Sequence, residues 1–214
     1  MPDLLIVGAG GFARETAQLV RALPGRRLAG FLEDGTSRRG TLVDGVPVLG
    51  PPEDATRSDA DVVVCTGSPR DYASRARIVA RLALPASRYA TLVHPTAWTA
   101  ESCALGPGTV VLAGTVLTAS VTVGAHVAVM PHTTLTHDDV IEDFATIASG
   151  VRLGGSVRVG AGAYVGAGAL VREGVTVGAG ALVGMGAVVL EDVPPGEVWA
   201  GNPARRLRSP GGSG

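Results

Sequence analysis

The side chains of this chain that are best suited to acid–base chemistry are its histidines and the carboxylates beside one of them. His137 is followed directly by Asp138 and Asp139, and His132 precedes it in an H-x4-H spacing. An imidazole titrates near neutral pH, so His137 could remove a proton from an acceptor amine or hydroxyl while a neighbouring carboxylate orients the ring. Two histidines at this spacing could instead supply zinc ligands. The local sequence leaves both kinds of site open.

These residues lie inside a six-residue repeat that fills the second half of the chain. From Leu105 to Val189 every sixth residue is Ile, Leu or Val without exception, and glycine often follows it. Most residues two positions earlier are small or valine, as at Thr109 and Val151. A period of six fits neither an α-helix nor a heptad coiled coil, and it indicates a parallel β-solenoid whose triangular coils each contain three hexads. The aliphatic residues should point into the core, and successive coils should stack at about 4.8 Å.

The repeat also predicts which residues share a corner of the solenoid. Residues three hexads apart should stack on adjacent coils, which puts the backbone N–H of Gly155 about one strand spacing from His137. A base beside a hydrogen-bond donor suits acyl transfer, because the donor can stabilise an oxyanion. Asp139 occupies a position where the repeat usually has a small residue. It could either hydrogen-bond corner N–H groups or assist His137. We expect His126 to be solvated at a different corner.

The segment before the repeat follows an alternating pattern of apolar runs and amphipathic stretches. Strands are predicted over 3–7, 27–34 and 61–67 and helices over 8–23 and 68–82, which together indicate a small Rossmann-like parallel sheet with crossover helices. The turn at Gly8, Gly10 and Gly11 could hold a phosphate at the start of the first helix, or it could be a tight turn without a ligand. Ala13 replaces the third glycine of a dinucleotide fingerprint, which weakens that assignment.

Composition excludes several classes of partner. The formal net charge of −1 gives no basis for binding nucleic acid or an anionic membrane surface. No apolar run reaches the roughly 18 residues of a membrane span, and the N-terminus lacks the basic and apolar regions of a signal peptide. Two cysteines do not make a disulfide framework and suit a reducing cytosol, so we expect a cytoplasmic protein with Cys65 as a buried core thiol.

Six features occur in one order along nearly the whole chain: a GAGGFARE loop, a FLED strand, a VVVCTGSPR segment, the hexapeptide repeats, an HDDVIEDF corner and a GNPARR tail. This combination resembles the hexapeptide-repeat family that contains sialic-acid O-acetyltransferases and nucleotide amino-sugar N-acetyltransferases. The resemblance implies a left-handed β-helix, a homotrimer, acetyl-CoA lying in the groove between adjacent prisms, and a sugar acceptor held partly by the N-terminal domain. Residues 1–92 would then bind substrate, residues 93–193 would form the acyltransferase β-helix, and residues 194–214 would form a cap and a flexible tail.

The family's site residues can be carried over position by position. His137 matches the catalytic base, Asp138 the carboxylate that follows it, and Gly155 a backbone N–H near the thioester carbonyl. Thr146 falls where some relatives have a second histidine, and Met130 stands where the amino-sugar enzymes tend to carry an asparagine near the acceptor amine. The resemblance assigns the remaining binding positions as follows: Gly184 and Gly186 to the CoA groove, and Gly10, Gly11 and Asp34 to the nucleotide-sugar pocket.

The expected activity is transfer of an acetyl group from acetyl-CoA to an amine or hydroxyl of a sugar, with a nucleotide-linked amino sugar as the first candidate and no metal. O-acetylation of sialic acid or another small hydroxyl acceptor is the alternative.

The sequence leaves two other classes of protein open. A trimeric zinc protein like the β-helix carbonic anhydrases would need a third ligand at Thr96, and His94 is out of register. His94 precedes Pro95 at the domain boundary, and we expect it to be structural, while His132 either lines the substrate pocket or is exposed. A catalytically silent scaffold is the remaining class.

Overall fold

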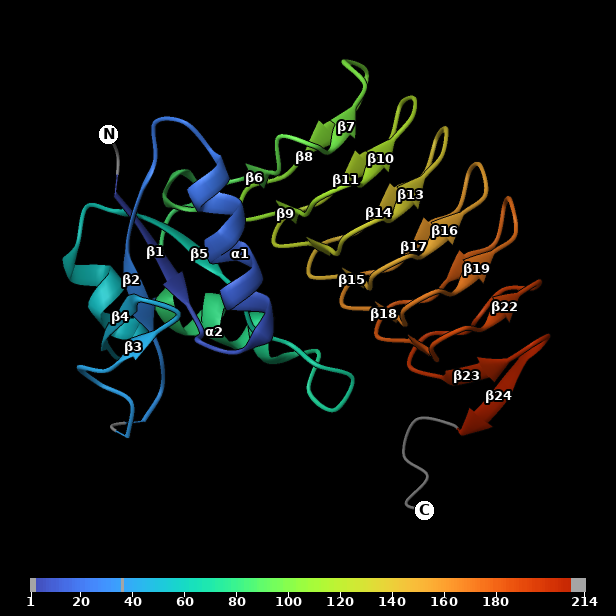
Figure 1. Cartoon of the computed structure of the whole chain (residues 1–214). Helices are drawn as coiled ribbons and strands as arrows, with labels where there is room; N and C mark the ends of the chain where they lie inside the picture. The colour runs from blue at the N-terminus through green and yellow to red at the C-terminus, as the bar shows by residue number, and fades with distance from the viewer. Residues whose placement is uncertain (1–2, 36, 209–214) are drawn as a thin grey trace.

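The chain folds into an α/β domain followed by a long parallel β-helix (Figure 1). This computed structural model describes residues 3–35 and 37–208. The expected flexible tail over 209–214 lies outside the described residues. Neither α-helix of the described part is long and apolar enough to cross a membrane.

The α/β domain contains one five-stranded sheet with two α-helices. The strands are β1 (Asp3–Val7), β2 (Arg27–Leu32), β3 (Leu42–Val43), β4 (Val46–Gly50) and β5 (Asp61–Val64); the helices are α1 (Gly11–Ala22) and α2 (Ser74–Leu82), with short 3-10 turns at Pro52–Arg57 and Ala86–Arg88. The order is β3-β4-β2-β1-β5, and β4, β2, β1 and β5 run parallel. The predicted parallel sheet with crossover helices is therefore confirmed. The hairpin of β3 and β4 was not predicted from the sequence.

The glycine-rich turn joins β1 to α1 at the carboxyl edge of this sheet. Gly8 has φ +106°, and a Cβ there would lie 2.7 Å from the carbonyl oxygen of Cys65 at the end of β5. Only glycine allows the turn to lie this close to its neighbour. A Cβ at Gly10 or Gly11 would meet nothing within 4 Å, so these two residues border open space.

The β-helix consists of two-residue strands on three faces. The first face contains β6 (Leu92–Val93), β9 (Val110–Val111), β12 (Ala128–Val129), β15 (Thr146–Ile147), β18 (Tyr164–Val165) and β21 (Leu182–Val183). The second contains β7 (Trp98–Thr99), β10 (Val116–Leu117), β13 (Thr134–Leu135), β16 (Arg152–Leu153), β19 (Leu170–Val171) and β22 (Val188–Val189). The third contains β8 (Ala104–Leu105), β11 (Thr122–Val123), β14 (Val140–Ile141), β17 (Arg158–Val159) and β20 (Thr176–Val177).

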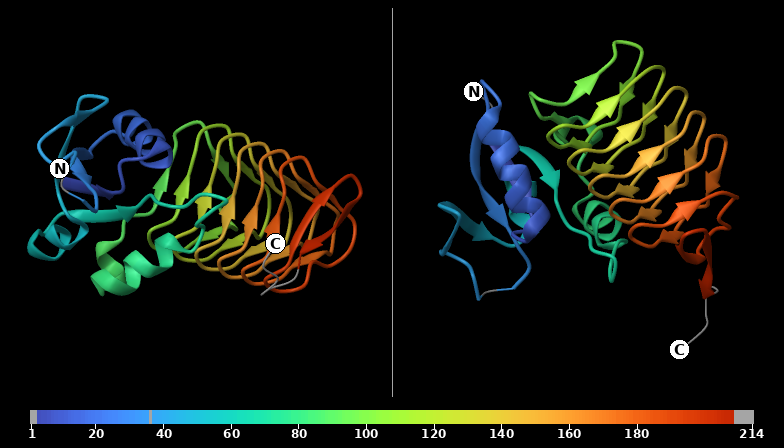
Figure 2. Two further views of the ribbon diagram at one scale, coloured as in Figure 1. Left: turned by 90° about the horizontal axis from the view of Figure 1, so that it is seen from below. Right: turned by 45° about the vertical axis from the view of Figure 1, so that its right-hand side comes forward.

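Pairing within each face follows the predicted spacing of three hexads. Val129 pairs with Ile147 and Val159 with Val177, both in parallel. Each aliphatic residue of the repeat from Val111 to Val189 is buried, and together they fill one continuous core. Figure 2 shows the coils stacked one behind another along the prism. The predicted parallel solenoid is thus confirmed.

The third residue of each tight corner adopts a left-handed backbone conformation. Most corners use glycine there, as at Gly150, but Asp138 has φ +64° and His126 φ +55°. Asp tolerates this conformation better than most residues because its short side chain can hydrogen-bond locally. In this conformation the Asp138 carboxylate hydrogen-bonds the preceding histidine.

The α/β domain packs on the first face and on the corner between the third and first faces. Leu92 and Val110 of the first face belong to the same buried cluster as the interior of the α/β domain. His126 is only 6% exposed, because its ring stacks on Phe144 at 5.1 Å and meets Tyr89 edge-on at 4.5 Å. Our expectation of a solvated His126 is wrong: the repeat predicts an outward corner, but the α/β domain covers it. Burial lowers the pKa of His126 to about 4.

A short hairpin closes the far end of the prism. Strand β23 (Val198–Gly201) pairs with β21 of the last coil, and β24 (Ala204–Arg208) pairs antiparallel with β23. Trp199 and the buried Ala204 contact the end of the aliphatic core. These strands cover core residues that would otherwise face water, as the end of a solenoid requires.

Candidate active site

His137 stands at the corner where the second face turns into the third, between β13 and β14. Its side chain is 64% exposed, and its Nδ1 lies 2.9 Å from Oδ2 of Asp138. We assign the proton of the neutral imidazole to Nδ1, since the carboxylate can only accept a hydrogen bond. The lone pair of Nε2 is then available to an incoming proton, which is the state that a general base requires.

The imidazole of His137 lies directly against Gly155 on the next coil. A Cβ added to Gly155 would lie 2.3 Å from both Cε1 and Nε2 of the ring, so no other residue fits without moving the imidazole. The N–H of the following residue, Ser156, donates to the carbonyl of His137 at 2.8 Å. The N–H of Gly155 itself has no acceptor within residues 3–35 and 37–208. The imidazole of His137 therefore adjoins a glycine whose N–H has no partner in the described part of the chain.

Asp139 points into the prism instead of toward the imidazole. Its side chain is fully buried, and its two oxygens accept hydrogen bonds from the backbone N–H groups of Thr136 (2.7 Å) and Val157 (2.9 Å). Of the two roles expected from the sequence, the structure shows the hydrogen bonds to corner N–H groups. Burial raises the pKa of this carboxyl to about 7, although the two N–H groups oppose that rise.

A cavity of about 410 Å³ opens at the carboxyl edge of the α/β sheet, where the glycine turn meets the loop after β5. Gly10, Gly11 and Asp34 all line it, so the structure brings together the three positions predicted for a nucleotide sugar. Arg81 contacts both carboxylate oxygens of Asp34 at 3.0 Å. The open glycine turn at the start of α1 leaves backbone N–H groups that could donate to a phosphate.

A second cavity of about 220 Å³ lies between the two domains, on the first face of the prism. It is lined by Met130 and Thr146, together with Phe12, Gly67 and Tyr164. Phe12 and Gly67 also line the larger cavity, so the two spaces adjoin.

Arg75 also lines the second cavity, and sequence reasoning missed it. This side chain is 2% exposed and donates to the carbonyls of Thr66, His126 and Phe144 at 2.7–2.9 Å. It also donates to the hydroxyl of Thr146 at 2.9 Å. Burial lowers the pKa of its guanidinium to about 10. Arg75 therefore links the α/β domain to two coils of the β-helix by hydrogen bonds alone.

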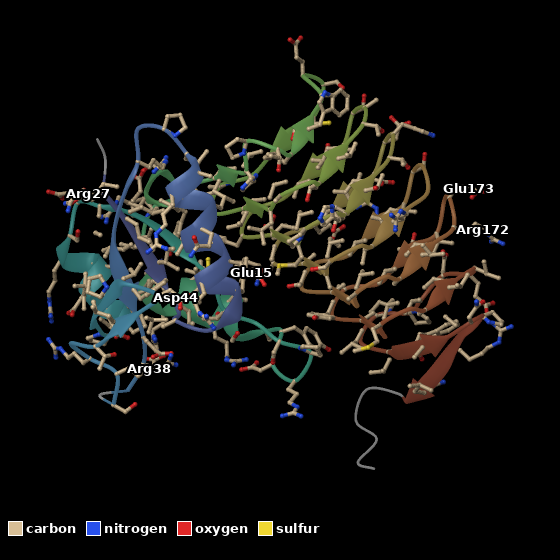
Figure 3. All side chains as sticks on the ribbon, in the orientation of Figure 1. Glu15, Arg27, Arg38, Asp44, Arg172 and Glu173 are labelled. Atoms are coloured by element: carbon tan, nitrogen blue, oxygen red, sulfur yellow. The ribbon has the colours of Figure 1, made fainter. Side chains whose placement is uncertain are left out.

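The predicted site residues fall on opposite sides of one chain. Met130, Thr146, Gly184 and Gly186 lie on the first face or at the corner that follows it, as does His132. The corner of His137 is the one opposite the first face. Figure 3 shows this separation, because Arg172 and Glu173, two coils along that same corner, lie at the edge of the prism farthest from the α/β domain.

His132 and His137 are likewise held apart. They stand at opposite ends of the second face, separated by β13. Within the described part of the chain, no cluster of three or more His, Cys, Asp or Glu side chains could hold a metal ion. The H-x4-H spacing therefore does not bring these two imidazoles together on one corner of the prism.

Comparisons with known proteins agree with this architecture. A profile described as the PglD N-terminal domain matches residues 3–82. The UDP-N-acetylbacillosamine N-acetyltransferase of Bacillus subtilis is 32% identical over 119 residues, which are 53% of this chain. The match spans about half the length of that curated relative, 52%.

Two solved structures match over almost their entire length. The acetyltransferase domain of PglB from Neisseria gonorrhoeae, in complex with acetyl coenzyme A, is 31% identical with a TM-score of 0.85, covering 96% of this chain and 98% of that one. A variant of perosamine N-acetyltransferase from Caulobacter crescentus, in complex with CoA and GDP-perosamine, is 27% identical with a TM-score of 0.87, covering 98% of both chains. The chain belongs to the PglD-like hexapeptide-repeat acetyltransferase family.

Proposed function

We propose that this protein transfers the acetyl group of acetyl-CoA to the amine of a nucleotide-linked amino sugar, with His137 as the general base. The observation that carries the proposal is the imidazole of His137, held by Asp138 on one side and lying against Gly155 on the other. The choice of acceptor is supported by two relatives that are named as amino-sugar N-acetyltransferases.

In the proposed reaction, the acceptor nitrogen attacks the thioester carbonyl of acetyl-CoA within a ternary complex. Nε2 of His137 takes the proton that the attacking amine loses, and Asp138 stabilises the resulting imidazolium. The N–H of Gly155 donates to the oxyanion of the tetrahedral intermediate. Collapse of that intermediate completes the amide and breaks the C–S bond, and the proton on Nε2 passes to the departing CoA thiolate.

The proposed enzyme is a homotrimer of left-handed β-helices in which a neighbouring chain completes each site. The position of His137 opposite the first face supports this, because the prism itself separates the base from both cavities of its own chain. A neighbour that brought its first face to this corner would supply an acceptor pocket. It would also supply the proposed CoA groove, which contains Gly184 and Gly186.

The second face offers surface suited to such an interface. Trp98 is 56% exposed and Leu170 is 44% exposed, and the half-buried side chains of Val116 and Val188 lie on the same face. Thr134 and the exposed Arg152 stand between these pairs, so the face presents two apolar patches, which are more stable against another protein surface than against water. In the trimer we assign residues 1–92 to acceptor binding, 93–193 to the catalytic β-helix and 194–214 to the cap and tail. The absence of a metal requirement and the cytoplasmic location stay predictions.

A sugar hydroxyl is the second candidate acceptor, and Met130 is the observation that favours it. Met130 lines the cavity between the domains, where its thioether offers a weak acceptor in place of an amide. An amine that needs an amide partner would lack one at this position. O-acetylation of sialic acid or a similar small acceptor would not meet this difficulty.

A substrate panel tests the proposal. Purified protein is incubated with acetyl-CoA and UDP- or GDP-linked amino sugars, free sialic acid and simple amines, and released CoA thiol and acetylated product are measured. We expect saturable N-acetylation of a nucleotide-linked amino sugar, with a kcat that His137→Ala lowers by about 10²- to 10⁴-fold. Turnover of sialic acid alone would favour the hydroxyl acceptor, and absence of acetyl transfer to every acceptor would contradict the proposed activity. Light scattering should give the mass of three chains, and a fully active monomer would contradict the shared site.

A further inference from the structure

Asp139 is a buried carboxylate that the proposed reaction does not use. It occupies a core column of the prism whose neighbours on the adjacent coils are Val121 and Val157, followed by Val175. All three valines are buried, and no Arg or His within the described residues forms an ion pair or hydrogen bond with Asp139. Burying a carboxylate in an aliphatic column costs free energy. The hydrogen bonds of Asp139, which valine could not make, offset this cost.

The two hydrogen bonds of Asp139 connect the corner that carries His137 to the corner of the next coil that carries Gly155. Oδ2 accepts from Thr136, the residue immediately before His137. Oδ1 accepts from Val157, two residues after Gly155 on the next coil. One rigid carboxylate thus fixes the relative position of the two corners whose contact forms the site.

Other coils do without this connection. At the same position on neighbouring coils, Val121, Val157 and Val175 supply no side-chain acceptor. At another corner, the hydroxyl of Thr109 accepts from the N–H of Val127 at 3.0 Å, and the exposed carboxylate of Asp143 accepts from the N–H of Ala125 at 2.7 Å. Asp139 adds a second N–H, that of Thr136, and it does so only on the coil that carries His137.

We propose that Asp139 is a positioning residue that holds the imidazole of His137 over Gly155 by clamping the two corners together. The proposal rests on the proposed function only for its kinetic test, since the clamp is a feature of the fold. Its ionised form suits both N–H donors, because each oxygen can accept one of them. A protonated carboxyl presents an O–H toward one of those donors and weakens the clamp.

The charge of Asp139 is set by its burial, by two backbone N–H groups and by two neighbouring side chains. Burial favours the neutral acid and Asp138 favours it further, whereas His137 and the two N–H groups favour the ionised form. The adjacent coils contribute only Val121 and Val157 at this position, so they bring no charge. With a pKa raised to about 7, Asp139 changes from the ionised to the neutral form as the pH falls through neutrality.

The test compares Asp139→Val and Asp139→Asn with the unaltered protein and with Thr109→Val, a matched control that removes a similar bond away from the base. Valine continues the aliphatic column, so we expect Asp139→Val to keep or raise the thermal midpoint. Its kcat should fall about 10- to 100-fold, since a misplacement of about 1 Å has this effect. KM for acetyl-CoA should change less than about twofold. Asp139→Asn keeps one acceptor oxygen, so its kcat should lie between those of the unaltered protein and Asp139→Val. Thr109→Val should have the kcat of the unaltered protein.

Hydrogen exchange of the Thr136 and Val157 amides is measured in the same variants, because it does not depend on the reaction. Faster exchange of both amides in Asp139→Val, with the rest of the prism unchanged, is the expected result. A kcat within twofold of the unaltered protein, or unchanged exchange, would overturn the positioning role. If the unaltered protein acetylates no acceptor, the proposed function fails, and the exchange result alone decides whether the clamp exists.

Discussion

Gly155→Ala perturbs the proposed site with a single methyl group. The backbone should tolerate the change, because Gly155 does not have a left-handed φ and the equivalent position of other hexads holds alanine, at Ala125 and Ala161 on a different corner. The new Cβ would lie 2.3 Å from Nε2 of His137, where an ordinary contact needs at least 3.4 Å. The imidazole must therefore retreat by about 1 Å while the fold persists.

A displacement of about 1 Å at a reacting group lowers turnover roughly 100-fold, equivalent to about 2.7 kcal/mol in the activation barrier. The assay is release of the CoA thiol with both substrates saturating, together with a thermal melt. Ala161→Gly makes the reverse exchange at a corner without an imidazole and should keep full activity. A kcat for Gly155→Ala within threefold of the unaltered protein, at equal thermal stability, would refute the proposed contact between base and donor.

Three further predictions follow from buried groups and from the proposed chemistry. His126→Ala removes a ring packed between Tyr89 and Phe144 and should lower the free energy of unfolding by about 3 kcal/mol in a denaturant titration. Because the pKa of Asp139 is raised to about 7 in the fold and is about 3.9 when unfolded, its contribution to stability is lost as pH rises from about 4 to about 7. Unfolding measured across this range should therefore show Asp139→Val gaining stability relative to the unaltered protein as pH rises. Dialysis against a strong chelator should leave turnover unchanged. A loss of turnover that added zinc reverses would contradict the metal-free mechanism.

The hexapeptide period was sufficient to predict the β-helix, because each aliphatic residue has only one way to reach the core of a triangular coil. The same period predicted that His137 and Gly155 stack, and the structure brings the ring and the glycine into contact. The spacing could not assign Asp139 to one of its two roles, because that depends on the direction of the side chain at a corner.

What the sequence could not supply depends on how the two domains pack. His126 was predicted to be solvated because the repeat pattern gives its position on the coil but carries no information about the α/β domain that covers this corner. Arg75 lies in the first turn of an amphipathic helix, where the sequence alone indicates an ordinary surface residue. In the structure, however, corner carbonyls of the prism accept its hydrogen bonds. Docking of the domains also creates the cavity that contains Met130 and Thr146. No spacing within either segment encodes these contacts.

The measurement that tests the central claim most directly is the turnover of His137→Ala with acetyl-CoA and the best nucleotide-linked amino sugar. The side chain is 64% exposed, so its truncation should leave the thermal midpoint and CoA affinity close to those of the unaltered protein. Loss of a general base predicts a kcat that is lower by about 10²- to 10⁴-fold. Near-normal turnover by a folded, CoA-binding His137→Ala would contradict the account, and His132 would then be the next candidate for the base.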